Sequence, residues 1–160
     1  MKTLSKVGIV AVLLFSLLAS FSPVQADMHQ MQMILEDQSK FDFAETTARF
    51  EENVEAAGWK VVGVYDYREI LADQGHEILD IKIYALCSGR HSAAILSLDH
   101  ERMVSPLMPC TISIYEKSDG NVYIARLNSG QVAQPFGGTI AEVMSVVAEE
   151  TEDIVADLIQ

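Results

Sequence analysis

The sequence predicts a single α+β domain with elements in the order β-α-β-(α)-β-α-β-β-α. Two long segments, residues 43–57 and 139–158, carry apolar residues at helical spacing. Shorter segments rich in β-branched and aromatic residues lie between them, as expected for strands. Asp119 and Gly120 separate the last two of these segments, and Asp-Gly is typical of a tight hairpin turn. A chain of 160 residues also has the length of one domain.

Residues 1–26 are expected to be a secretory signal peptide. Two lysines precede an apolar run over residues 7–21, and a small-residue cleavage site ends at Ala26. The alternative is an uncleaved anchor helix, but this run of about 15 residues is shorter than the ~20 that cross a bilayer. Cleavage after Ala26 predicts a periplasmic or secreted domain, residues 27–160, with no membrane contact afterwards.

The first helix of the domain has clear boundary signals. Asp42 lies three residues before Glu45, which is the spacing of a capping box. Gly58 stands where a glycine commonly ends a helix. These residues predict a helix over residues 43–57, and the apolar residues before it predict a first strand over residues 31–35.

Two further strands and a short helix are predicted next. Residues 59–65 are β-branched and aromatic, and residues 67–72 read as a short helix. Residues 78–86 alternate between apolar and polar, which predicts a third strand with one apolar side. Cys87 continues that apolar side.

The second half of the domain is predicted to contain a hairpin between two helices. A short helix is expected over residues 91–98, and a fourth strand begins at Cys110 on its apolar side. The turn at residues 118–121 leads into a fifth strand over residues 122–127. The helix over residues 139–158 ends the domain.

The net charge of −12 restricts the partners of the protein. Nucleic acids and anionic lipid surfaces both require clustered basic residues, so neither is an expected partner. The sequence contains no nucleophile elbow, zinc-protease helix motif or phosphate-binding glycine loop. We therefore assign no catalytic residue and expect a binding protein rather than an enzyme.

Cys87 and Cys110 carry the main functional hypotheses. If the third and fourth strands are antiparallel neighbours, the two cysteines face each other at one end of the sheet; a parallel arrangement stays open. One interpretation is an inert structural disulfide or a pair of buried thiols. A bridge closing a loop of ~23 residues would stabilise the fold by roughly 3 kcal/mol.

The other two interpretations give these cysteines a function. In a reactive pair, Arg90, His91 and a helix N-terminus after Cys87 would lower the pKa of its thiol, and Cys110 would resolve the disulfide or persulfide. In a soft-metal site, Met108 and His91 would join both cysteines as ligands. Thiolate and thioether sulfur select Cu(I), which makes copper the candidate cofactor.

A second copper site is predicted at the new amino terminus. Cleavage after Ala26 would expose Asp27, Met28 and His29. A free amine, two amide nitrogens and the imidazole of His29 can surround Cu(II) in a square plane. The alternative is an ordinary frayed terminus.

Several motifs together resemble the DUF302 family over nearly the whole domain, about residues 31–157. The motifs are A-A-G-W (Ala56–Trp59), A-L-C (Ala85–Cys87), L-M-P-C (Leu107–Cys110), Y-E-K-S-D-G-N-V-Y-I (Tyr115–Ile124) and F-G-G-T-I-A-E-V-M (Phe136–Met144).

The resemblance implies a TATA-box-binding-protein-like fold, a single mostly antiparallel sheet of about five strands packed against two long helices. It also implies a homodimer, and it implies no DNA binding, because a shared fold does not carry function. The family's cysteine-bearing branch implies that Cys87 and Cys110 belong together. Gly89 departs from the family pattern, which often has proline at that position.

We therefore expect a small periplasmic or secreted binding or carrier protein that uses Cys87 and Cys110 in redox, sulfur or copper handling. One alternative is a thiol–disulfide oxidoreductase that cycles a bridge between these cysteines. Another is a structural or interaction dimer with an inert disulfide. The sequence does not identify the small ligand or the redox partner.

Overall fold

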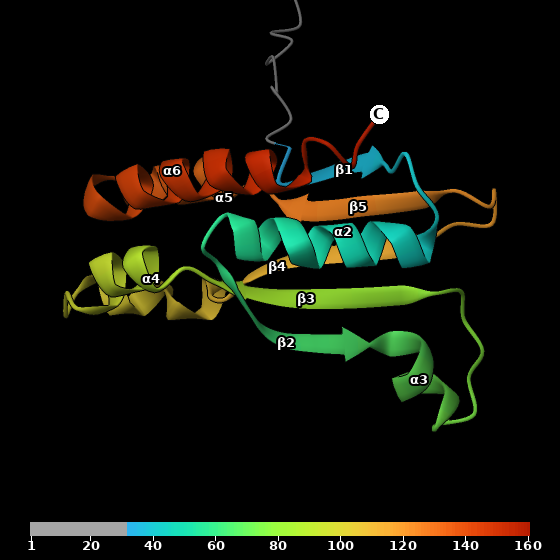
Figure 1. The fold of residues 1–160 in the computed structure, drawn as a ribbon. Coiled ribbons are helices and arrows are strands. Elements are labelled where there is room, and N and C mark those ends of the chain that lie inside the picture. The colour runs from blue at the N-terminus through green and yellow to red at the C-terminus, as the bar shows by residue number, and fades with distance from the viewer. Residues whose placement is uncertain (1–31) are drawn as a thin grey trace, which may run out of the picture. The chain divides into compact units, whose positions relative to one another are not determined.

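The computed structural model describes residues 32–160, which form one five-stranded antiparallel sheet in the order β1-β5-β4-β3-β2. Figure 1 shows the long helices α2 and α6 lying over this sheet. The predicted fold class is confirmed. The elements are β1 (Ile34–Gln38), α2 (Phe43–Ala56), β2 (Lys60–Asp66), α3 (Tyr67–Ala72), β3 (Ile81–Cys87), α4 (Gly89–Leu96), η1 (Glu101–Leu107), β4 (Cys110–Glu116), β5 (Val122–Leu127), α5 (Ser129–Ala133), η2 (Gln134–Phe136) and α6 (Gly138–Val155).

Helix α2 begins and ends where the local sequence predicts. The side chain of Asp42 accepts a hydrogen bond from the backbone N–H of Glu45 at 2.8 Å. This bond satisfies one of the N–H groups that have no partner inside the helix. Gly58 follows the helix with a φ of 75°, a conformation that glycine adopts without a steric penalty. Both boundary signals therefore act through local geometry alone.

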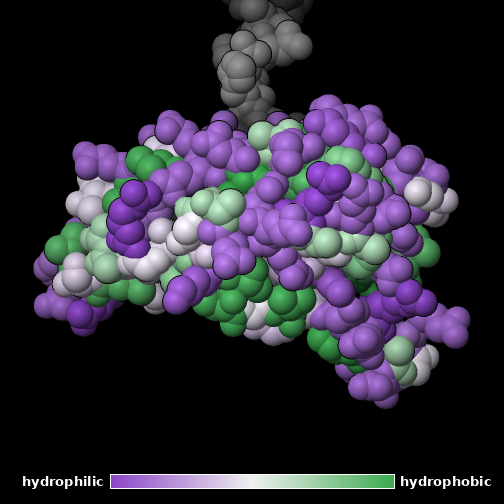
Figure 2. Space-filling view, in the orientation of Figure 1, coloured by the Kyte–Doolittle hydropathy of each residue, from purple (hydrophilic) through white to green (hydrophobic). Residues whose placement is uncertain are grey.

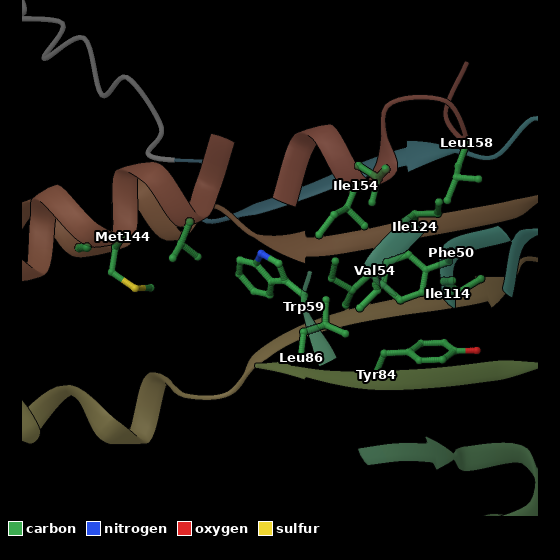
Figure 3. Close-up of a cluster of buried hydrophobic side chains, with 14 of the residues drawn as sticks. Phe50, Val54, Trp59, Tyr84, Leu86, Ile114, Ile124, Met144, Ile154 and Leu158 are labelled. Atoms are coloured by element: carbon green, nitrogen blue, oxygen red, sulfur yellow. The ribbon is translucent and has the colours of Figure 1, made fainter. Parts of the chain in front are cut away.

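The core lies between the two long helices and one face of the sheet. Figure 3 shows the side chains of α2, α6 and the central strands meeting in this layer. Burying one such side chain stabilises the fold by about 1.5–3 kcal/mol, so packing rather than helix propensity holds α2 and α6 in place. The buried residues include Phe50 and Val54 of α2, Tyr84 and Leu86 of β3, Ile112 and Ile114 of β4, Ile124 of β5, and Met144, Val147 and Ile154 of α6.

Strand β3 buries the opposite face from the one that its alternation predicts. Tyr84 and Leu86 are almost completely buried in the core, whereas Ile81 and Ile83 are half-buried on the other face of the sheet. Both sides of this strand carry apolar residues, so alternation alone identified the wrong side. The strand also begins at Ile81 rather than at residue 78.

The remaining elements agree with the prediction to within a few residues, apart from three short ones. Helix α3 has the predicted bounds, and α4 begins two residues earlier than predicted. Strand β1 begins at Ile34, later than expected. The helices η1, α5 and η2 were not predicted; each is a short connecting segment without a strong periodic pattern.

The predicted signal peptide and its cleavage site after Ala26 lie outside the described residues. Within residues 32–160, no helix is both long and apolar enough to cross a bilayer. Figure 2 shows a largely hydrophilic surface in this view, with hydrophobic side chains gathered over the edge strand β2. Val62 and Val64 of that strand are among the exposed large hydrophobic residues.

Candidate functional site

Cys87 and Cys110 lie in adjacent strands at the same end of the sheet. Strands β3 and β4 are antiparallel, which answers the question that the sequence leaves open. Cys110 is paired with Leu86, and Cys87 is the next residue of β3. The spacings within and between antiparallel strands place the two Cα atoms roughly 6 Å apart.

The two cysteines nevertheless occupy opposite faces of the sheet. Directly paired residues share a face, so Cys110 lies with Leu86 on the helix-covered face. Neighbouring residues of a strand alternate, which places Cys87 on the other face. The expectation that both lie on one apolar side is therefore wrong, because it took the half-buried side of β3 for the core side. Both cysteines are free thiols in this structure.

Cys110 lines a small cavity together with other side chains that can bind a soft metal. The cavity, of about 20 Å³, is lined by Met108, Cys110, Met144 and His91, and otherwise mostly by apolar groups such as Trp59. A space of this size holds one water-sized group. Three of the four residues named from the sequence for a soft-metal site thus share one cavity. The fourth, Cys87, is not among its lining residues.

Met144 is a member of this set that sequence reasoning missed. It belongs to the apolar stripe of α6 and is 4% exposed, so its pattern is that of an ordinary core residue. Figure 3 shows its side chain projecting from α6 into the interior. Only the packing of α6 over the sheet brings it to Cys110, and no local signal in the sequence reports that packing.

Cys110 and Met144 also line a second cavity, of about 30 Å³, on the side of β5. Arg126 contributes to this wall and is almost completely buried, but its charge is matched. It donates to Asp37 at 2.8 Å and to Glu152 at 2.7 and 2.5 Å. These ion pairs connect β5 to β1 and to α6. Because both carboxylates neutralise Arg126, its side chain does not present an unpaired positive charge to the cavity.

The surroundings of Cys110 favour its neutral thiol. Burial, and secondarily the nearby Cys87 thiol, raise the pKa of Cys110 to about 11. Burial acts in this direction because a thiolate loses its hydration in an apolar environment. Cys87 lies just before the N-terminus of α4. Its Sγ is 3.5 Å from Oγ of Ser92, a residue of that helix.

Glu150 of α6 contacts Trp59 and His91, two residues that line the cavity. Its Oε2 accepts a hydrogen bond from Nε1 of Trp59 at 2.9 Å and lies 2.9 Å from Nε2 of His91. Arg90 also donates to its carboxylate. Figure 3 shows the indole nitrogen of Trp59 directed toward α6. No motif in the sequence identifies Glu150 as part of this site.

The charge of Glu150 is stabilised by these contacts. Partial burial on its own would raise the pKa of Glu150, but hydrogen bonds from His91 and Trp59, together with the charge of Arg90, lower it below its usual value. Glu150 is therefore an ionised acceptor at neutral pH. Its side chain is only 26% exposed, so the carboxylate faces the protein more than the solvent.

Within residues 32–160, no three His, Cys, Asp or Glu side chains are grouped closely enough to hold a metal ion. Any metal at Cys110 therefore depends on the thioether sulfurs of Met108 and Met144. The other predicted copper site, at Asp27, Met28 and His29, lies outside the part of the chain that the structure describes.

Comparisons with known proteins identify the fold and leave the activity open. The family described as "Domain of unknown function DUF302" matches residues 35–159. The chain is similar to a solved structure, an uncharacterized conserved DUF302 protein from Bacillus stearothermophilus, with a TM-score of 0.71 and 16% sequence identity. The match covers 79% of this chain and 98% of that one, and at this identity it shows the fold alone. No curated protein matches the sequence.

Proposed function

Because the chain belongs to the DUF302 family, whose description assigns no function, we propose a role from the site itself: the protein is a carrier that binds one Cu(I) ion at Cys110. The observation that supports this proposal is the set of side chains around one small cavity. Three of its lining residues, Cys110, Met108 and Met144, carry sulfur in their side chains, and a fourth, His91, carries an imidazole.

The chemistry of this set favours Cu(I) over other common metals. Thiolate and thioether ligands select Cu(I), whereas magnesium, calcium and manganese require oxygen ligands. The rest of the lining is mainly apolar, including Trp59 and Leu86, and offers little to a hydrated divalent ion. Binding would replace the Cys110 thiol proton with the metal, so that one proton is released for each ion bound.

Thiol–disulfide exchange between Cys87 and Cys110 is the alternative proposal. The short distance between their strand positions supports it. Their placement on opposite faces argues against it, because a disulfide needs Cβ atoms that approach to about 3.8 Å. A bridge would require the end of β3 to rotate, whereas a metal at Cys110 requires no change of face.

We also propose that the carrier acts outside the cytoplasm, as a homodimer of the processed chain. The leader-like residues 1–26 support export, and the family resemblance supports the dimer. Intact mass spectrometry of the native protein would show a chain that begins at Asp27. Sedimentation equilibrium of that material would give twice the mass of one chain; the mass of a single chain would contradict the dimer.

Anaerobic titration with Cu(I) against a chromophoric chelator tests the metal proposal. We expect one ion per chain, and we expect Cys110→Ser to weaken binding by more than about tenfold. Met108→Leu and Met144→Leu nearly conserve volume and should also weaken it. The matched controls are Cys87→Ser, which removes a thiol outside the cavity, and Met103→Leu, which removes a thioether that is 70% exposed.

Unchanged affinity in Cys110→Ser would overturn the proposal. Equal losses of Cu(I) affinity in Cys87→Ser and Cys110→Ser, together with reduction of a disulfide substrate by the wild type, would instead support the oxidoreductase.

A further inference from the structure

His91 is held in one orientation by a carboxylate. The residue is 8% exposed, and its Nε2 lies 2.9 Å from Oε2 of Glu150 and 3.1 Å from Nη2 of Arg90. An ionised carboxylate can only accept a hydrogen bond, and a guanidinium can only donate one. Glu150 therefore requires a proton on Nε2 of His91, whereas Arg90 requires a lone pair there.

The contacts of Arg90 show which of these two states of Nε2 the structure favours. Arg90 donates directly to the other oxygen of Glu150, so it does not need His91 as an acceptor. Glu150 also accepts from Trp59, and this third contact fixes the position of its carboxylate. The arrangement is satisfied when Nε2 of His91 carries the proton and donates it to Glu150. The neutral imidazole then has its lone pair on Nδ1.

The other ring nitrogen is the one available to a ligand. Among the hydrogen bonds within residues 32–160, those of the His91 ring all involve Nε2. His91 also lines the cavity that contains Cys110 and Met108. A histidine that binds a metal usually donates its second N–H to a carboxylate, which fixes the tautomer and raises the basicity of the ligand nitrogen.

We infer that Glu150 is a positioning residue that fixes His91 as the Nε2–H tautomer, so that Nδ1 is the nitrogen ligand of the metal cavity at Cys110. This inference rests on the proposed function and deepens it. It assigns the nitrogen ligand and the residue that prepares it before the metal arrives. Trp59 and Arg90 support Glu150 in turn by donating to its carboxylate.

The carboxylate could instead act only as a structural tie between α6, α4 and the start of β2. A structural tie would affect stability, but it would not choose between the tautomers of His91. The test therefore needs a readout of the imidazole itself. Glu150→Gln preserves the shape of the side chain, and Glu150→Leu removes the acceptor. Glu149→Gln is the control, since Glu149 is its exposed neighbour on the same helix.

Nitrogen-15 NMR of the metal-free protein at neutral pH reports the tautomer of His91. We expect Nε2–H in the wild type and in Glu149→Gln, and loss of this single tautomer in Glu150→Leu. Cu(I) affinity should fall about 10- to 100-fold in Glu150→Gln and stay unchanged in Glu149→Gln. X-ray absorption of the Cu(I)-loaded wild type should show one nitrogen neighbour besides sulfur, and His91→Ala should lose it.

These readouts separate the two proposals. A metal-free wild type with the proton on Nδ1, or a loaded wild type with sulfur neighbours only, would overturn the role of Glu150 while leaving Cu(I) binding at Cys110 intact. Unchanged Cu(I) affinity in Glu150→Gln would overturn it as well. A wild type that binds no Cu(I) would defeat the proposed function and this inference together.

Discussion

Tyr84 packs edge-on against Phe50, with ring centroids 5.0 Å apart, where β3 meets α2. Tyr84 is completely buried, and its hydroxyl makes no hydrogen bond of standard geometry with the side chains and backbone of residues 32–160, although Glu51 and Thr47 lie nearby. Burial, and then the charge of Glu51, raise the pKa of Tyr84, so the hydroxyl stays neutral. A buried hydroxyl without a partner costs about 1–3 kcal/mol.

Tyr84→Phe should therefore stabilise the protein by about 1 kcal/mol, because it removes the unpaired hydroxyl and keeps the ring contact with Phe50. Urea unfolding of both proteins measures the difference. Tyr115→Phe is a useful control, since Tyr115 donates its hydroxyl proton to Glu36 at the surface and should gain nothing. A less stable Tyr84→Phe would mean that Glu51, Thr47 or a bound water satisfies the hydroxyl.

Tyr84 also illustrates the limit of sequence patterns in this fold. The boundaries of α2 were predictable because Asp42 and Gly58 act on the backbone beside them. The buried face of β3 was not predictable, because a strand with apolar residues on both sides has no local preference for either one. The long helices α2 and α6 decide, because their buried side chains pack against Tyr84 and Leu86 on one face of the sheet.

In the candidate site, too, some features follow from the local sequence and others only from tertiary packing. The proximity of Cys87 and Cys110 followed from where two predicted strands end and begin. Met108 precedes Cys110 in the chain, so sequence reasoning also found it. Met144 and Glu150 lie on a distant helix, and their relation to the site depends on how α6 packs over the sheet. That packing comes from the whole core, and no motif encodes it.

Two aspartates cap helices of different importance, and their removal should have different effects. Asp42 caps α2, which has four buried residues, so Asp42→Ala should destabilise the protein by about 1 kcal/mol. Asp66 makes the same bond to Glu69 at the start of α3, which buries none of its residues. Asp66→Ala should thus loosen α3 with little effect on global unfolding. Urea unfolding and amide hydrogen exchange together measure this contrast, and equal global losses would contradict it.

The raised pKa of Cys110 predicts slow, strongly pH-dependent alkylation. In a Cys87→Ser background, reaction of Cys110 with iodoacetamide should keep accelerating above pH 9, because the thiolate is the reactive form and the pKa of Cys110 in the wild type is about 11. The measurement is the pseudo-first-order labelling rate followed by mass spectrometry. Unfolded protein in urea is the reference, and its rate should level off at lower pH. A folded-state profile that levels off with the unfolded one would contradict the burial of this thiol.

The raised pKa of Cys110 also makes the stability of the fold depend on pH. A thiol whose pKa rises on folding contributes stability that is present below its unfolded pKa, ordinarily 9.0, and is lost as the pH rises toward about 11. Wild type should therefore lose stability relative to Cys110→Ser across this alkaline window and not below it.

Arg126 should show strong coupling between its two carboxylate partners. The Arg126 side chain is 3% exposed, while those of Asp37 and Glu152 are 40% and 43% exposed. Either single change, Asp37→Asn or Glu152→Gln, leaves one carboxylate to neutralise the buried guanidinium, so each should cost only about 1 kcal/mol. The double variant leaves Arg126 buried and unpaired, and this should cost about 3–5 kcal/mol. Urea unfolding of the four proteins gives the coupling energy, which should exceed about 1 kcal/mol. Strictly additive losses would show that solvent reaches Arg126 once its partners are removed.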